Sequence, residues 1–161
     1  MTQTTSRSGR LVLGAATVTT GLVAGAFYVF ACGVMPALSR SDDRVYVQVM
    51  RDINDVIQNP VFLLGFLGAP VLTAVAARQA RGGPHRRWVW AALTASALAF
   101  LVTVAFNIPL NDALTDDGSY AALREEFEDP WAVWNGVRAG LLTVASGCLA
   151  RALTKISPSG V

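Results

Sequence analysis

The side chains best suited to chemistry lie in one stretch, Trp131-Ala-Val-Trp134-Asn135-Gly-Val-Arg138. If this stretch is helical, Trp131, Asn135 and Arg138 fall at positions i, i+4 and i+7 and share one face. Trp134 and Arg138 are also four residues apart, close enough for the guanidinium to lie against the indole. A guanidinium one turn inside an apolar helix is costly to leave unpaired in lipid, so other residues must meet it.

Two further stretches supply candidate partners for this arginine. They contain Asn54, Asn59, Asn107, Asn111 and Asp112. We expect the three stretches to close over a polar pocket at one membrane surface. Amides, a cation, aromatic rings and a few carboxylates suit a partly polar aromatic ligand. They also suit chemistry in which the protein removes a proton and stabilises the resulting oxyanion.

A purely structural interpretation of the same residues stays open. In that interpretation Asn59 and Asn107 cap helices, Asn135 makes a hydrogen bond within the bundle, and Arg138 anchors a helix at the interface. A metal site is disfavoured, because transition metals usually bind His or Cys and the single histidine, His85, is expected on the other side of the membrane. The sequence holds no nucleotide-binding loop, no Ser-His-Asp or Cys-His set and no haem ligand pair. We therefore expect no metal and no cofactor.

The elements that must position these residues are membrane-spanning helices. The 161 residues are 53% hydrophobic and only 15% charged, with a mean hydropathy of +0.44, whereas about a quarter of the residues in a soluble domain are charged. Uncharged stretches predict four spans in a single domain of residues 1–161, at about 11–36, 60–78, 88–107 and 133–152. A water-soluble helical bundle would have to hide nearly every helix on all sides, which a chain this short cannot do.

Two short amphipathic helices are expected between the spans. The first covers residues 41–58, with Ser41 as its N-cap and an apolar stripe at Val45, Val49, Ile53 and Ile57. The second covers 119–129 and ends at Asp129-Pro130. Pro36 is expected to end the first span, and Asn107 the third. The predicted fold class is all-α: a four-helix transmembrane bundle with two short extracytoplasmic amphipathic helices.

The charges indicate an orientation. All 11 acidic residues lie on one side of the predicted spans. Eight of the 13 basic residues lie on the other side, with both termini: Arg7, Arg10, Arg78, Arg81, Arg86, Arg87, Arg151 and Lys155. The positive-inside rule then places both termini in the cytoplasm and the amphipathic helices and asparagines outside. We expect a multi-pass protein of the bacterial cytoplasmic membrane, without nucleic-acid binding because the basic residues flank spans and form no stripe.

Several motifs resemble those of a known family. They are Gly21-Leu-Val-Ala-Gly25-Ala-Phe-Tyr-Val-Phe30, Val34-Met35-Pro36, Ile53-Asn54, Asn59-Pro60-Val-Phe62, Asn107-Ile-Pro109-Leu-Asn111, Phe127-Glu128 and Trp131-x-x-Trp134-Asn135-x-x-Arg138. In this order they resemble the anthrone oxygenase-like family of small membrane proteins. The resemblance implies four spans and, for characterised members, oxidation of anthrones to anthraquinones by dioxygen without metal or flavin. The resemblance does not identify catalytic residues.

Roles for the candidate residues follow if that activity applies. Arg138 would be the partner of the developing oxyanion, because it stays protonated at any working pH. The slot for the aromatic substrate would be lined by Phe27, Tyr28, Trp131 and Trp134. Substrate and dioxygen would be oriented by Asn54, Asn59, Asn107, Asn111 and Asn135. The base stays open among Asp112, Glu126 and Glu128.

The expected partners are a hydrophobic aromatic small molecule, dioxygen and membrane lipid. The alternative is a non-catalytic protein that binds a lipid, a quinone or a small aromatic molecule, or that serves as a subunit of a membrane complex. The oligomeric state is left open.

Overall fold

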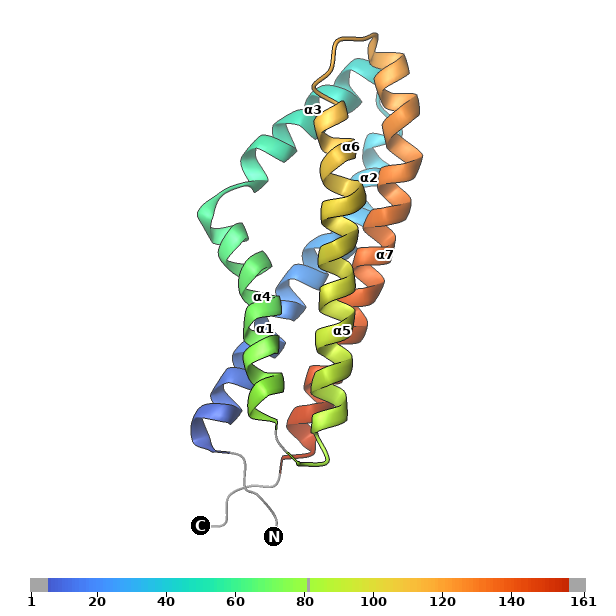
Figure 1. Cartoon of the computed structure of the whole chain (residues 1–161). Helices are drawn as coiled ribbons and strands as arrows, with labels where there is room; N and C mark the ends of the chain where they lie inside the picture. Colours follow the sequence, from blue (N-terminus) through green and yellow to red (C-terminus); the bar gives the residue numbers. More distant parts are fainter. Residues whose placement is uncertain (1–5, 81, 157–161) are drawn as a thin grey trace.

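The computed structural model describes residues 6–80 and 82–156, so Arg81 lies outside the described residues. Within these residues all regular elements are helices, joined by short loops (Figure 1). The elements are α1 (Arg7–Val29), η1 (Phe30–Val34), α2 (Met35–Leu38), α3 (Asp43–Ile57), α4 (Pro60–Gln79), α5 (Arg86–Val102), η2 (Thr103–Asn107), α6 (Ile108–Ala113) and α7 (Tyr120–Thr154). The segments η1 and η2 are short π-helical turns, in which the helix is locally wider.

Four continuous helical stretches are long and apolar enough to cross a membrane, as predicted. They are Arg7–Leu38, Pro60–Gln79, Arg86–Ala113 and Tyr120–Thr154. Many of their large apolar side chains point outward, Leu22, Val61 and Leu64 among them. Such a surface suits lipid rather than water, because soluble proteins rarely expose large contiguous apolar areas. The chain is a multi-pass membrane protein.

The four spans form one bundle in which α7 packs against α1 and α5, and α4 packs against the same two helices. At the end where α1 begins, the core consists largely of small side chains such as Ala16, Ala76, Ala92 and Ala145. Small residues let helix backbones approach closely in a membrane. At the opposite end the core is built from larger side chains, including Tyr46, Met50, Phe127 and Trp131.

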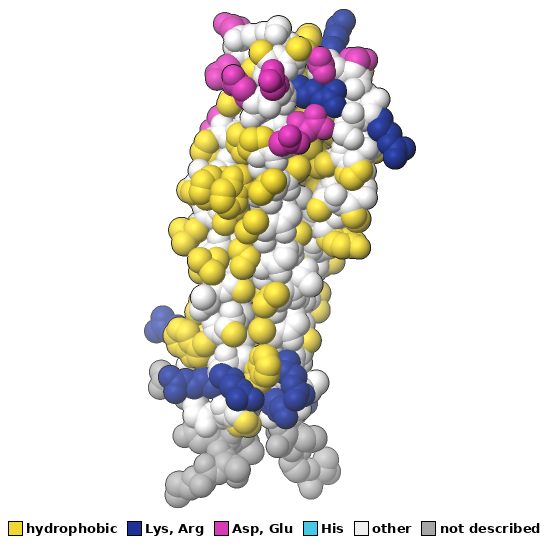
Figure 2. All heavy atoms as spheres, turned by 90° about the vertical axis from the view of Figure 1, so that its right-hand side faces the viewer, with side chains coloured by type: hydrophobic (Ala, Val, Ile, Leu, Met, Phe, Trp, Pro, Cys, Tyr) yellow, Lys and Arg dark blue, Asp and Glu magenta, His cyan; other side chains and the backbone are white. Residues whose placement is uncertain are grey.

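The two ends of the bundle carry opposite charges. Figure 2 shows a band of Lys and Arg side chains around one end, acidic side chains gathered at the other, and an apolar surface between them. We call the end with the first residue of α1 and the last residue of α7 the basic end, and the end with α3 and the first turns of α7 the acidic end. His85 lies buried at the basic end, and burial lowers its pKa.

Pro36 does not end the first span, and Asn107 does not end the third, in which Pro109 follows it, contrary to the expectation. The first span continues to Leu38 and the third to Ala113. In both cases a π-helical turn precedes the proline, and the proline is the second residue of the α-helical segment that follows. Proline is tolerated in the first turn of an α-helix, where its missing N–H leaves no bond unmade. The wide turn therefore lets the helix restart around the proline.

The helix expected to end at Asp129-Pro130 also continues. Ser119 caps it through a bond from the amide of Ala122, at 3.3 Å, and α7 then runs 35 residues through Pro130. Pro130 is exposed, so its ring meets no neighbouring helix there. Phe127 and Trp131 on either side are buried and stack on one another, which holds the helix together across the proline. The second short helix is thus the first part of α7.

The first amphipathic helix is present as α3, with a different cap and a different buried face. Asp42 is the N-cap and accepts a bond from the amide of Val45 at 2.9 Å, whereas Ser41 donates to the carbonyl of Leu38. The buried residues are Tyr46, Val47 and Met50 instead of the predicted stripe. The face is rotated because the first half of α3 packs against Phe127 and Trp131 of α7.

Candidate functional site

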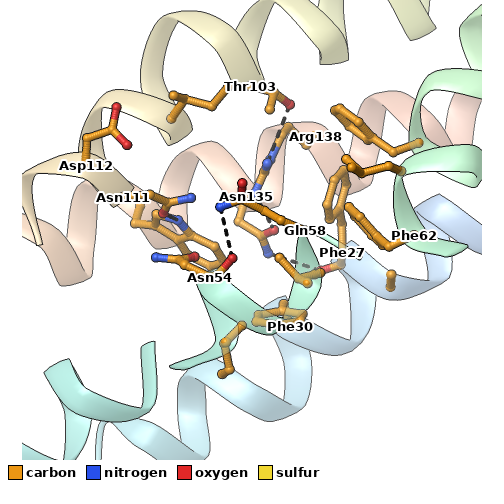
Figure 3. A pocket seen from close by; sticks show the side chains of 17 residues that line it. Phe27, Phe30, Asn54, Gln58, Phe62, Thr103, Asn111, Asp112, Asn135 and Arg138 are labelled. Carbon is orange, nitrogen blue, oxygen red and sulfur yellow. Dashed lines mark hydrogen bonds between the residues drawn. The ribbon is translucent and has the colours of Figure 1, made fainter. Parts of the chain in front are cut away.

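A pocket of about 290 Å³ lies toward the acidic end, among α1, α3, α4, α6 and α7 (Figure 3). Its lining consists of Ala26, Phe27, Phe30, Ile53, Asn54, Ile57, Gln58, Phe62, Leu63, Phe66, Thr103, Ile108, Asn111, Asp112, Trp131, Asn135 and Arg138. The volume is close to the lower limit of about 300 Å³ for ligand sites. The lining is mostly apolar, with a few polar groups of definite placement.

The floor of the pocket is a hydrogen-bonded set around Asn135 and Arg138. Both side chains are buried, 0% and 5% exposed. The amide nitrogen of Asn135 donates to the carbonyl oxygen of Phe27 at 3.1 Å, and its oxygen accepts from Nη2 of Arg138 at 3.1 Å. Nη1 of Arg138 donates to the hydroxyl of Thr103 at 3.5 Å. Asn135 thus links the arginine to the backbone of α1 and fixes its direction.

Two aromatic rings cover the guanidinium of Arg138. Its central carbon lies 4.2 Å from the ring centroid of Phe27 and 5.6 Å from that of Trp131. Within the described residues no carboxylate forms an ion pair with it, and its buried Nε has no hydrogen-bond partner. The positive charge is therefore held by neutral groups and π faces, which leaves its field available to a ligand oxygen.

The contact predicted between Trp134 and Arg138 is absent from this arrangement. Trp134 stacks instead on Phe106, with ring centroids 3.7 Å apart. Arg138 turns toward the pocket, where Phe27 and Trp131 meet it. Trp134 is offset by about 60° around α7 from Trp131, and its ring packs on Phe106 while that of Trp131 packs on Phe30 and Phe127.

One side of the pocket is polar. Figure 3 shows Asn54 and Asn111 together on this side, with Asp112 beyond them. Asn111 accepts a hydrogen bond from the indole nitrogen of Trp131 at 2.7 Å, so its amide nitrogen is the group it can offer to a ligand. Gln58 adds a further amide. Asp112 is the one carboxylate of the lining and is exposed at the pocket mouth.

The other side is a group of phenylalanines. Phe62 and Phe66 on α4 stack with centroids 5.8 Å apart, and Phe27 meets Phe66 edge-on at 6.3 Å. Phe30 lies against Trp131 at 5.9 Å. Figure 3 shows Phe27 and Phe62 on the side away from Asp112. The pocket is therefore apolar at one side and lined by amides at the other.

The structure brings together seven of the thirteen candidate residues. Those lining the pocket are Phe27, Asn54, Asn111, Asp112, Trp131, Asn135 and Arg138. Those outside its lining are Tyr28, Asn59, Asn107, Glu126, Glu128 and Trp134.

The residues outside the lining have other surroundings. Tyr28 is 61% exposed, because it follows Phe27 by one residue and points about 100° away around α1. Asn59 caps α4 by accepting from the amide of Phe62 at 3.0 Å, so the capping interpretation holds for it. Glu126 is exposed, and Glu128 accepts a bond from Arg124 at 2.6 Å.

Asn107 is the least expected of this group. It is 1% exposed at the end of η2, and neither polar atom of its side chain has a hydrogen-bond partner in the described structure. It therefore makes no side-chain cap for α6, contrary to the capping interpretation. Its side chain is buried and does not line the pocket.

Ten lining residues are absent from the candidate set, and five of these carry an aromatic ring or a polar group. They are Phe30, Gln58, Phe62, Phe66 and Thr103. Helical spacing could have pointed to some of them, since Phe30 follows Phe27 by three residues and Phe66 follows Phe62 by four. Thr103 had no such signal, because only the packing of η2 against α7 brings it to Arg138.

The described residues contain no group of three or more His, Cys, Asp or Glu side chains suited to hold a metal ion. The pocket can instead accept a flat aromatic body between the phenylalanines and Trp131. An electron-rich oxygen of such a ligand would be met by Arg138, and other polar groups by Asn54, Gln58 or Asn111.

Four helices long and apolar enough to span a membrane, with a pocket toward the acidic end, define a small helical membrane protein. The family model for anthrone oxygenase matches residues 55–148. The match covers more than half of the chain, so the chain belongs to the anthrone oxygenase family. The matched segment runs from α3 into α7 and includes Asn111, Asp112, Asn135 and Arg138. No curated protein and no solved structure matches the chain.

Proposed function

We propose that this protein is a membrane oxygenase that oxidises an anthrone-like polycyclic aromatic with dioxygen, using no metal or flavin. The observation that carries the proposal is the buried Arg138, held by Asn135 and Thr103 at the floor of an aromatic pocket and free of a carboxylate partner in the described structure. Family membership supports oxygenase chemistry.

The reaction needs a base and an oxyanion donor on opposite sides of the central ring. An anthrone carries its ketone at one position of that ring and its acidic methylene at the opposite one. We assign Arg138, on the floor, to the ketone oxygen, and Asp112, at the mouth, to the methylene proton. Loss of the proton gives an electron-rich enolate whose negative charge rests largely on the oxygen beside Arg138.

Dioxygen then accepts electrons from the enolate. The former methylene carbon forms a bond to oxygen, giving a hydroperoxide after protonation, and loss of one water leaves the quinone. One anthrone and one dioxygen thus become one anthraquinone and one water. Asn54, Asn111 and Gln58 would orient the substrate and the bound oxygen, while the phenylalanines would hold the aromatic rings.

The test is oxygen uptake with an anthrone by protein reconstituted in vesicles, with protein-free vesicles giving the uncatalysed rate. Arg138→Gln should lower turnover by about 100-fold or more, the usual cost of one lost oxyanion donor. Asp112→Asn should lower it by a similar factor, as expected for a general base. Glu126→Gln is the matched control, because Glu126 is exposed outside the pocket.

Size-exclusion profiles in detergent check that each variant still folds. If Arg138→Gln does not fold, Arg138→Lys, which retains the positive charge, is measured in its place. Near-wild-type uptake in both Arg138→Gln and Asn135→Ala would show that this pocket is not the catalytic site. Loss of oxygen uptake in Glu126→Gln but not in Asp112→Asn would show that the general base is not Asp112 and lies outside the pocket.

The second candidate is a non-catalytic protein that binds a lipid, quinone or small aromatic in the same pocket. It is favoured by the exposure of Asp112, whose carboxylate is solvated in the free protein. Purification with a tightly held, unreactive ligand or a stoichiometric partner protein, together with no oxygen uptake, would support it over the oxygenase.

A further inference from the structure

The mouth of the pocket is marked by the few lining residues that are exposed. These are Gln58 at the end of α3, Leu63 on α4, and Ile108 and Asp112 on α6. The buried members of the lining, Arg138 among them, lie at the floor. The pocket therefore opens between the start of α4 and α6, on the side of the bundle.

The depth of this mouth in a membrane follows from the helix rise. Charged residues at the basic end mark one edge of the apolar layer at Arg78 on α4 and Arg87 on α5. A hydrocarbon core of about 30 Å corresponds to about 20 helical residues at 1.5 Å each. Counted from these arginines, the other edge falls near Gln58 and near Asn107. Leu63 lies below that edge, inside the hydrocarbon, and Asp112 lies above it.

The surface around the lower part of the mouth is apolar and exposed. Leu64 is 78% exposed next to Leu63, Leu67 is exposed one turn after Leu63, and Val104 is exposed one turn before Ile108. Side chains of this kind at this depth face lipid acyl chains. The upper part of the mouth, at Gln58 and Asp112, faces the headgroups.

From this geometry we infer that the pocket opens sideways into the bilayer and takes its ligand from the membrane, through a portal between Leu63 and Ile108. This rests on the pocket of the proposed function and names its substrate class. The substrate is an uncharged, membrane-dissolved polycyclic aromatic whose ketone faces Arg138 and whose other polar groups face the headgroup side. We expect a water-soluble anionic derivative to bind far more weakly, because its charge would have to leave water to pass the apolar edge of the portal at Leu63.

The arrangement inside the pocket matches such a route. The phenylalanines form the side that lies away from Asp112, and the amides Asn54 and Asn111 form the side near it (Figure 3). A ligand that enters from the acyl chains thus keeps its apolar body among the phenylalanines of α1 and α4. Its polar groups reach the amides without crossing an apolar wall.

The first experiment measures binding rather than turnover. Anthraquinone is the probe, because it is flat, uncharged and at the oxidation end point. The protein retains Trp131, which lines the pocket, as its single tryptophan, with Trp88, Trp90 and Trp134 replaced by phenylalanine. Quenching of Trp131 fluorescence is followed in vesicles at several lipid concentrations. The control is a protein that retains only Trp134, which lies outside the pocket lining. Its quenching measures collisions with anthraquinone in the bilayer that do not require the pocket.

The expected result is that half-quenching occurs at a constant anthraquinone-to-lipid ratio, so that the total probe required rises in proportion to the lipid. Anthraquinone-2-sulfonate should give no quenching beyond that of the Trp134 control. Half-quenching at a constant aqueous concentration, with the sulfonate binding equally well, would overturn the portal.

The second experiment obstructs the portal after the protein has folded. Leu63→Cys is labelled with a bulky maleimide in detergent and then reconstituted, in a background in which Cys32 and Cys148 are replaced by serine and alanine. Leu64→Cys, labelled in the same way, is the matched control, because Leu64 is exposed next to Leu63 but does not line the pocket. Labelled Leu63→Cys should slow the onset of quenching by about tenfold or more, within the range over which association rates of variants differ.

The outcomes separate this inference from the oxygenase proposal. Binding from the bilayer with no oxygen uptake would support the portal and contradict the oxygenase proposal. Full oxygen uptake, with equal rates of quenching onset in the two labelled variants, would support the oxygenase proposal and contradict the portal.

Discussion

Within the described part of the chain, the guanidinium of Arg138 is buried in a spanning helix without a carboxylate partner. The amide of Asn135, the hydroxyl of Thr103 and the rings of Phe27 and Trp131 surround the guanidinium. A carboxylate partner would neutralise the charge and lower its effect on a ligand. With neutral partners the arginine is costlier to bury, but its charge can still stabilise a negative oxygen of a ligand. This explains why such an arginine would lie at the floor of a pocket.

Trp131 joins the polar and aromatic sides of this site. Its ring lies against Phe30 and Phe127, and its indole nitrogen donates to Asn111 at 2.7 Å. Trp131→Phe keeps a ring but removes the donor. We expect it to lower the free energy of unfolding by about 1 kcal/mol, because Asn111 loses a partner in a partly buried place.

The measurement is unfolding of the protein in mixed detergent micelles by denaturing detergent, followed by circular dichroism. Trp134→Phe is the matched control, since its ring stacks on Phe106 and a phenyl can replace that stack. Equal losses in the two variants would show that ring packing, not the bond to Asn111, determines the effect.

Among the elements, the two π-helical turns border the pocket from opposite spans. Phe30 in η1 and Thr103 in η2 both line it, and each turn is followed by a proline at the second position of the next helical segment. Irregular helix geometry inside a membrane is tolerated where it is covered by protein or lines a cavity, and π turns recur at functional sites. The irregularities therefore mark the site along both spans.

Arg124 connects helix α3 and the segment before it to α7, in addition to the apolar contacts of Tyr46 and Met50. Arg124 donates to the carbonyls of Ser39 and Ser41 at 2.9 Å, to Asp43 at 3.0 Å and to Glu128 at 2.6 Å, and its guanidinium lies over Tyr46. These bonds fasten the segment before α3 and its first turn to α7. The second half of α3, with Asn54, then forms one side of the pocket.

We expect Arg124→Gln to loosen α3 while leaving the spans intact. The bonds lost are charge-assisted, so the local opening free energy of α3 should fall by about 2 kcal/mol. Hydrogen exchange read by mass spectrometry should show faster exchange of α3 amides and unchanged exchange in α5. Arg44→Gln is the control, because Arg44 is an exposed arginine on α3 itself. Unchanged protection of α3 in Arg124→Gln would mean that the apolar contacts of Tyr46 and Met50 suffice.

For the whole molecule, the opposite charges of the two ends predict its orientation. With the basic end in the cytoplasm, as the positive-inside rule requires, the pocket opens near the outer surface. In intact cells a cysteine in place of Gln79, exposed at the basic end, should resist an impermeant thiol reagent. A cysteine in place of Gly118, at the acidic end, should react.

Cys32 is exposed and Cys148 half-buried, so both are replaced first. Gly83 is a poor site for the probe, because a Cβ there would lie 2.5 Å from Cε1 of His85. Permeabilised cells give the control for reactivity at Gln79. Labelling of Gln79→Cys but not Gly118→Cys in intact cells would reverse the orientation and place the pocket at the cytoplasmic surface.

The sequence by itself determined the number of spans and the position of the site along them. Long apolar stretches between charges are a direct signal, because lipid admits few charges. The i, i+4, i+7 spacing of Trp131, Asn135 and Arg138 fixed their common face, which the structure confirms by burying all three. The length of the apolar stretches and the spacing of these three residues are both local properties of the sequence.

Only the tertiary structure decided which neighbours meet. Arg138 lies against Phe27 and not Trp134, because α1 crosses α7 at that level. Asp112 reaches the pocket while Glu128 pairs with Arg124, since η2 lets the third span continue past Asn107 toward the mouth. A sequence shows which residues share a helix face, but which face meets which neighbour depends on helix packing and on backbone irregularities that bring together residues far apart in the chain.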